Sequence, residues 1–138
     1  MSTGLNGELS EQAILTSVIE RLSSVAETKL DYSATGLYDS LDGPVILVRL
    51  ESLAETARQG EKGRFELQFA VNAVIRTSEQ TTLELMTLVR KIRTALNSAE
   101  KLCPETRKHV LSDTRFDIAS DHDQLSFAVS TLMVEAIL

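Results

Sequence analysis

RFELQFAVNAVIRT, residues Arg64–Thr77, is the stretch that decides the fold of this chain. The positions alternating with its apolar side chains are mostly polar or small, and Val74 is the one exception. A two-residue period is typical of a strand with one buried face, and this one runs for about twice the usual strand length. A strand this long in a chain of 138 residues predicts a sheet that extends beyond its own core. The apolar positions are Phe65, Leu67, Phe69, Val71, Ala73 and Ile75.

Length and composition predict one soluble globular domain. The chain is 43% hydrophobic and 25% charged, as ordinary globular domains are. We expect a single α+β domain over residues 10–138, preceded by a flexible segment over residues 1–9 that is small and polar. The net charge of −6 argues against specific nucleic-acid binding, which depends on a basic surface.

Location is predicted from what the sequence lacks. The single cysteine, Cys103, has no internal partner for a disulfide, which fits a reducing compartment. The N-terminal stretch MSTGLNGELSEQ has no basic and apolar regions of a signal peptide, and no apolar run approaches the ~18 residues of a membrane span. We therefore expect a cytoplasmic protein with no membrane partner.

Two helical stripes and four strand patterns follow one another along the chain. Ile14, Val18 and Leu22 recur at helical spacing, and Thr81 with Glu84 matches a capping box. Polar loops are expected over residues 31–43 and 54–63. In chain order the predicted elements are a helix over 11–28, strands over 45–53 and 64–77, a helix over 81–97, and strands over 110–119 and 125–138.

This order, α-β-β-α-β-β, predicts a two-layer α+β sandwich. Two hairpins would form one antiparallel four-stranded sheet, and the two helices would cover one face of it. The apolar C-terminal segment, residues 132–138, fits either a central strand buried on both faces or an edge that pairs with another subunit. We favour the central strand.

No group of residues has the spacing of a catalytic, cofactor or metal site. Asp121-His122-Asp123 would offer metal ligands, but a polar hairpin turn accounts for it better. Cys103 with either histidine would suggest a nucleophile and a base, yet no motif such as G-x-S-x-G surrounds it. We therefore predict no catalytic, cofactor-binding or metal-binding residues, and a protein that is not an enzyme.

Charge is distributed unevenly along the sequence. Between residues 90 and 108, six basic residues face two acidic ones, a net charge of +4, whereas residues 1–60 carry nine acids and four bases, a net charge of −5. Two interpretations fit this pattern equally well. The first is compensation of the helix dipole together with a solvated loop. The second is electrostatic complementarity between copies of the chain. In the second interpretation, Arg90, Lys91 and Arg93 are candidate subunit-contact charges.

The order, length and pattern of these elements resemble the tail terminator (tail completion, minor tail) proteins of long-tailed bacteriophages. The resemblance covers roughly residues 11–138 and depends on pattern, because that family has no catalytic motif. The matching pieces are EQAILTSVIERL, GPVILVRLESL, AETARQGEKG, RFELQFAVNAVIRT, TLELMTLVRKIRTAL, TRFDIAS and LSFAVSTLMVEAIL.

The resemblance implies a structural protein of a phage or prophage tail. It implies a homo-oligomeric ring, commonly a hexamer, that ends the tail tube and presents a surface for head joining. The implied partners are further copies of the chain, the tail tube protein and a head-completion protein, in the host cytoplasm during assembly and then in the virion tail. The family's mobile assembly loop would correspond to Glu55–Lys62, with Glu55, Arg58, Glu61 and Lys62 as candidate contact residues.

Two other classes remain open. The first is a small acidic dimeric binding module of the type III secretion chaperone kind, which is similar in size and charge but usually ends in a helix. The second is a small enzyme on an α+β scaffold, which the absence of a convergent constellation disfavours. Oligomer size separates the hexameric ring from the dimeric binding module.

Overall fold

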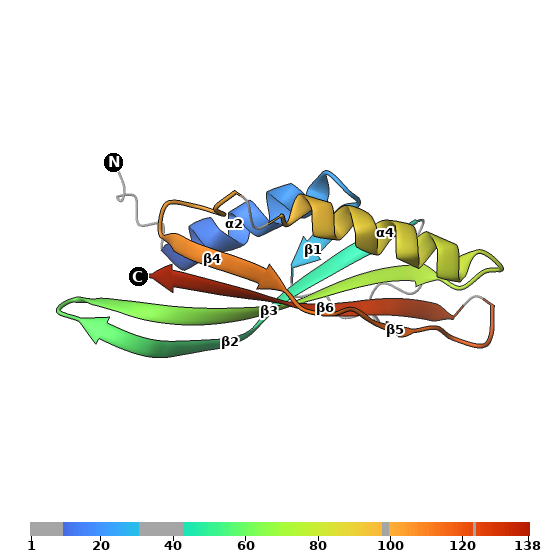
Figure 1. The fold of residues 1–138 in the computed structure, drawn as a ribbon. Helices are drawn as coiled ribbons and strands as arrows, with labels where there is room; N and C mark the ends of the chain where they lie inside the picture. Colours follow the sequence, from blue (N-terminus) through green and yellow to red (C-terminus); the bar gives the residue numbers. More distant parts are fainter. Residues whose placement is uncertain (1–9, 31–42, 98–99, 123) are drawn as a thin grey trace.

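The computed structural model describes residues 10–30, 43–97, 100–122 and 124–138. Helices α2 and α4 lie on one face of a six-stranded sheet (Figure 1). The strand order is β1-β2-β3-β6-β4, and β5 also pairs with β6, at residues of β6 that precede those paired with β4. The elements are α2 (Ser10–Ser23), β1 (Glu27–Leu30), β2 (Val45–Gln59), β3 (Lys62–Arg76), α4 (Thr81–Ala95), β4 (Thr106–Leu111), β5 (Arg115–Asp117) and β6 (Leu125–Ile137).

The long strand predicted around residues 64–77 is confirmed as β3. It pairs antiparallel with β2 along one edge and with β6 along the other. Its predicted apolar face is buried from Leu67 to Ile75, and these side chains form one core cluster with residues of both helices. Val74, the exception in the pattern, points to the opposite face, where it packs with Val45 and Leu47 in a second cluster.

The predicted fold class was wrong in the number and direction of strands. The sheet is mixed, because β1 runs parallel to β2 in the register Glu27↔Val45 to Leu30↔Val48. The helix predicted over residues 11–28 would have included Glu27 and Thr28, the first two residues of β1. The helix ends at Ser23, since Ser and Val are weak helix formers, and the Ser24 hydroxyl donates to the Arg21 carbonyl at 2.7 Å.

The loop predicted over residues 54–63 is a strand for most of its length. β2 continues to Gln59, and a two-residue turn, Gly60-Glu61, leads directly into β3. Gly60 has a φ of 61°, which a glycine adopts without strain. The polar composition indicated a loop, but the backbone hydrogen bonds to β3 determine the structure. The hairpin tip extends beyond the helices at one end of the molecule (Figure 1).

Two further predictions are corrected in detail. The capping box is absent, because Gln80 is the N-cap of α4 and makes no side-chain cap. The Thr81 hydroxyl instead accepts a hydrogen bond from the Ser78 amide at 2.6 Å. The strand predicted over 110–119 is divided into β4 and β5. β6 lies between β3 and β4, so the C-terminal segment is a central strand, as favoured, but it is buried on one face only, because buried and half-buried side chains alternate along it.

Candidate subunit interface

The two halves of β2 have different surroundings. Val45–Val48 is buried, with Ile46 and Val48 in the main core and Val45 and Leu47 in the second cluster. Every side chain described from Arg49 to Arg58 is exposed. β1 pairs only with the buried half. Within the described part of the chain, no strand pairs with the outer edge of residues 49–59, and an unpaired edge is a template for another strand.

Two β-bulges decide which side chains the exposed half presents. They lie between Leu50 and Ser52 and between Glu55 and Ala57. Each bulge inserts one residue, so side chains three positions apart share a face instead of two. The face that continues the core side of β2 therefore carries four residues, whose partners on β3 also share that face. These pairs are Leu50↔Phe69, Leu53↔Leu67, Glu55↔Phe65 and Arg58↔Gly63.

The hairpin tip is held by contacts of two predicted assembly residues. Arg58 donates from Nη2 to Glu55 Oε2 at 2.8 Å and from Nε to Glu55 Oε1 at 3.3 Å. The hydrogen bond to Glu55 and its charge raise the pKa of Arg58. Gly63 lies beneath this pair, since a Cβ atom there would come within 2.9 Å of Glu55 Oε2. Of the other predicted assembly residues, Glu61 is in the turn and Lys62 begins β3, both exposed.

Of the three predicted subunit-contact charges, Arg90 and Arg93 lie on the same side of α4 and line the same groove, because residues three apart are neighbours on a helix, whereas Lys91 points elsewhere. Arg93 is bound within its own chain, donating to the Ser112 carbonyl and to Thr114 Oγ1. Lys91 lines a hollow of about 460 Å³ beside the start of β2. Arg90 is exposed and lines a groove of about 780 Å³ between α4 and β5.

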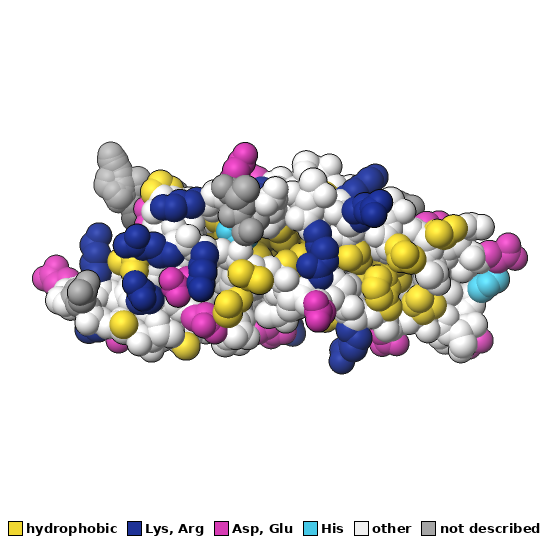
Figure 2. All heavy atoms as spheres, viewed as in Figure 1, with side chains coloured by type: hydrophobic (Ala, Val, Ile, Leu, Met, Phe, Trp, Pro, Cys, Tyr) yellow, Lys and Arg dark blue, Asp and Glu magenta, His cyan; other side chains and the backbone are white. Residues whose placement is uncertain are grey.

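This groove is a feature that the sequence did not reveal. Its apolar walls are Met86 and Val89 from α4 and Phe116 and Ile118 from the β5 segment. Figure 2 shows hydrophobic side chains gathered on this part of the surface. Phe116 and Ile118 lie two positions apart within the strand predicted over 110–119, and both line the groove. The α4 residues come from about thirty positions earlier, and no spacing rule links the two segments.

The histidines, the cysteine and the aspartates considered as catalytic or metal-binding candidates do not form a site. His109 is buried and donates through Nε2 to the Leu96 carbonyl at 3.1 Å, at the C-terminal end of α4. Burial raises the pKa of the Cys103 thiol, which disfavours the reactive thiolate. Asp121 and His122 are exposed, and Asp123 lies outside the described residues.

The described residues include neither a metal-binding cluster nor a membrane-spanning helix. No group of three or more His, Cys, Asp and Glu side chains in residues 10–30, 43–97, 100–122 and 124–138 is arranged to hold a metal ion. In the same residues, no helix has the length and apolar character needed to cross a membrane.

Comparison with known proteins identifies a fold but no family. No protein-family model and no curated protein sequence matches the chain. Its fold is similar to that of a chain in the structure described as "Virion of native gene transfer agent (GTA) particle". The TM-score is 0.58 at 12% sequence identity, and the match covers 99% of this chain and 100% of the other. At this identity the likeness concerns the fold, and it extends over both chains from end to end.

Proposed function

We propose that this protein is a structural subunit of a phage-like tail, forming a ring that ends the tail tube and offers a head-joining surface. The observation that carries the proposal is the match over both whole chains to a component of a gene transfer agent virion. The resemblance of the sequence pattern to tail terminator proteins adds to it. On this proposal the protein has no enzymatic activity, and its partners are its own copies, the tail tube protein and a head-completion protein.

The form of the molecule supports a role in assembly. β2 and β3 each have 15 residues, and their hairpin extends past the helices (Figure 1). The exposed half of β2 contributes little to the core, whereas its exposed leucines and its outer edge, which no strand among the described residues pairs with, suit contact with another molecule. The type III chaperone alternative is less favoured, because those proteins usually have a helix where strand β6 is the last element described here.

Molar mass and tube capping together test the proposal. Light scattering of the full chain over a wide range of concentrations should reveal a closed species of about six copies, because heterologous contacts that close by rotation give rings. Adding the protein to polymerising tail tube protein from the same gene cluster should stop tube growth. A strict dimer that leaves tube length unchanged would refute the proposal and favour a binding module.

A further inference from the structure

The groove between α4 and β5 is an apolar surface that nothing in the described chain covers. Met86 is 56% exposed, Phe116 40% and Ile118 41%. Arg90 is exposed at the same groove. Arg90 makes no ion pair with the described residues of its own chain. Solvent-facing apolar side chains gathered in one groove are typical of an interaction site.

A second exposed apolar surface lies on the hairpin half of β2. Leu50 is 44% exposed and Leu53 is 46% exposed, and the bulge between Leu50 and Ser52 places them on one face. Glu51 lies between them in the sequence, is exposed, and forms no ion pair with the described part of the chain. The groove therefore combines apolar side chains with the cation Arg90, and the Leu50–Leu53 segment combines two leucines with the anion Glu51.

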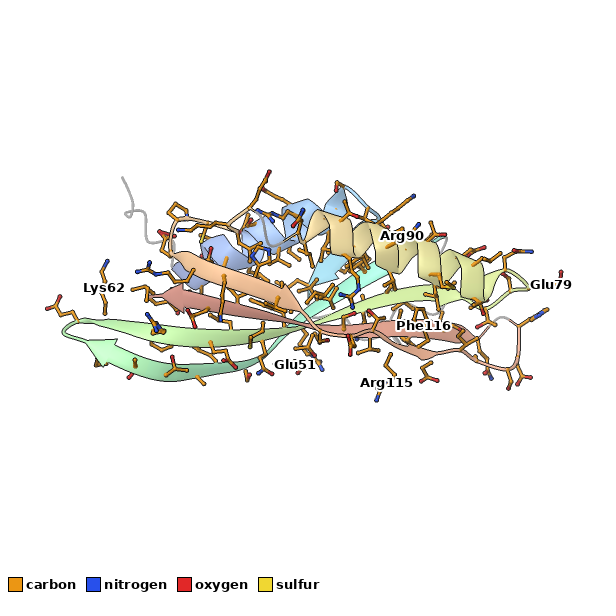
Figure 3. The ribbon with its side chains drawn as sticks, viewed as in Figure 1. Glu51, Lys62, Glu79, Arg90, Arg115 and Phe116 are labelled. Atoms are coloured by element: carbon orange, nitrogen blue, oxygen red, sulfur yellow. The ribbon has the colours of Figure 1, made fainter. Side chains whose placement is uncertain are left out.

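The two surfaces lie at different places along the molecule. Figure 3 shows Lys62 at the hairpin end, Glu51 near the middle, and Arg90, Arg115 and Phe116 toward the end where Glu79 lies. A contact between two different surfaces of identical chains is heterologous, so it repeats from copy to copy and either closes into a ring or continues as a filament. Complementary charges of this kind select the partner and its register.

We infer that the groove between α4 and β5 receives the Leu50–Leu53 segment of a second copy of this chain, with Arg90 facing Glu51 of that copy. The leucines would contact Met86 and Phe116, removing apolar surface of both copies from water. The inference rests on the proposed function, because it identifies the contact by which the copies of the ring associate. It also separates the roles of the basic residues of α4, since only Arg90 would act between subunits.

Charge reversal tests the pairing of Arg90 with Glu51. We expect R90E and E51R, each alone, to weaken association by about tenfold or more in light scattering, and the double variant R90E/E51R to recover most of it. E20R, a reversal at an exposed position of α2, is the matched control and should associate like the unchanged protein. Circular dichroism would verify that each variant is folded. Full association of both single variants, or no recovery in the double variant, would overturn the inference.

Cysteine cross-linking tests the same contact without relying on charge. L53C and M86C would be made in separate chains that also carry C103S, then mixed under a mild oxidant. We expect a disulfide-linked pair to form rapidly between the two variants. The control replaces M86C with L83C, which is 63% exposed on α4 but lines the hollow beside Lys91 instead of the groove. Equal cross-linking with L83C and M86C would count against the groove as the docking site.

Failure of this inference can be distinguished from failure of the proposed function. If the unchanged protein forms rings and caps tubes while R90E and E51R behave identically to it, the ring stands and its contact lies elsewhere. If the unchanged protein forms no oligomer at any concentration and leaves tubes uncapped, the proposed function fails and the inference fails with it.

Discussion

β2 contains two stretches of strand with the same hydrogen-bonded partner and opposite surroundings. In Val45–Val48 successive side chains enter the two buried clusters on either side of the sheet. In Arg49–Gln59 the backbone still pairs with β3, yet the described side chains are exposed. The comparison shows that pairing alone maintains the second half as a strand, while packing fixes the first. A segment that is ordered by its backbone has side chains available for another molecule.

The two halves of β2 should differ most in how much free energy of unfolding is lost when a side chain is truncated to alanine. Ile46 is fully buried, so I46A should lower the free energy of unfolding by about 2–5 kcal/mol through lost burial and a residual cavity. L53A removes a side chain that is already 46% exposed, and should cost less than about 1 kcal/mol. Urea denaturation at protein concentrations too low for association measures both. Similar losses in the two variants would show that the hairpin half belongs to the core.

The sequence predicted the buried half of the sheet better than the exposed half. Apolar residues recur every second position in the sequence of β3 because one face of this strand is buried, so the strand was predicted close to its observed bounds. AETAR, residues 54–58 in β2, has no buried face, and its charges are typical of a loop. Only the pairing with β3 makes it a strand, and pairing between segments is not a property of either segment alone. β1 was missed for the same reason, since its four residues depend on Val45–Val48.

The candidate interface was predictable only in part. The excess of basic residues over 90–108 was visible, but the sequence placed Arg90, Lys91 and Arg93 together as one group. In the structure Lys91 lines a different hollow, and of the two arginines at the groove Arg93 binds the segment between β4 and β5 within its own chain. The groove itself combines two segments that are brought together by the sheet, so it required the fold. The match to a virion chain concerns this fold and leaves the role of each charge as a prediction.

The next largest effect concerns side-chain packing around Gly63 at the tip of the β2–β3 hairpin. In G63A the new methyl group would lie 2.8 Å from Phe65 Cε2 and 2.9 Å from Glu55 Oε2, so the ring and the carboxylate must move. We expect a loss of about 1–3 kcal/mol in the free energy of unfolding. G43A is the matched control, because nothing lies within 4 Å of its added atom, and its stability should stay the same or rise slightly. Equal stability of G63A and the unchanged protein would indicate a tip that opens freely.

The smallest effect is local and concerns the ion pair between Glu55 and Arg58. Both side chains are exposed, and water screens such pairs, so R58A should leave the overall unfolding transition almost unchanged. Its effect should appear in the tip alone, where hydrogen exchange of the amides around Gly60 should become about two- to threefold faster. R49A is the control, because Arg49 is exposed on the same strand before the bulges and should not alter exchange at the tip.

The raised pKa of Arg58 fixes how this effect depends on pH. A cation whose pKa is higher in the folded protein stabilises the fold fully below its ordinary pKa, and this stabilisation is lost only as the pH rises through the higher value. That range lies far above neutrality, so loss of the Arg58 proton gives no pH dependence between pH 6 and pH 9. The ratio of the exchange rates in R58A and in the unchanged protein should therefore be constant across this interval, although both rates rise with pH. A ratio that changed steeply near pH 7 would mean that a group other than this pair orders the tip.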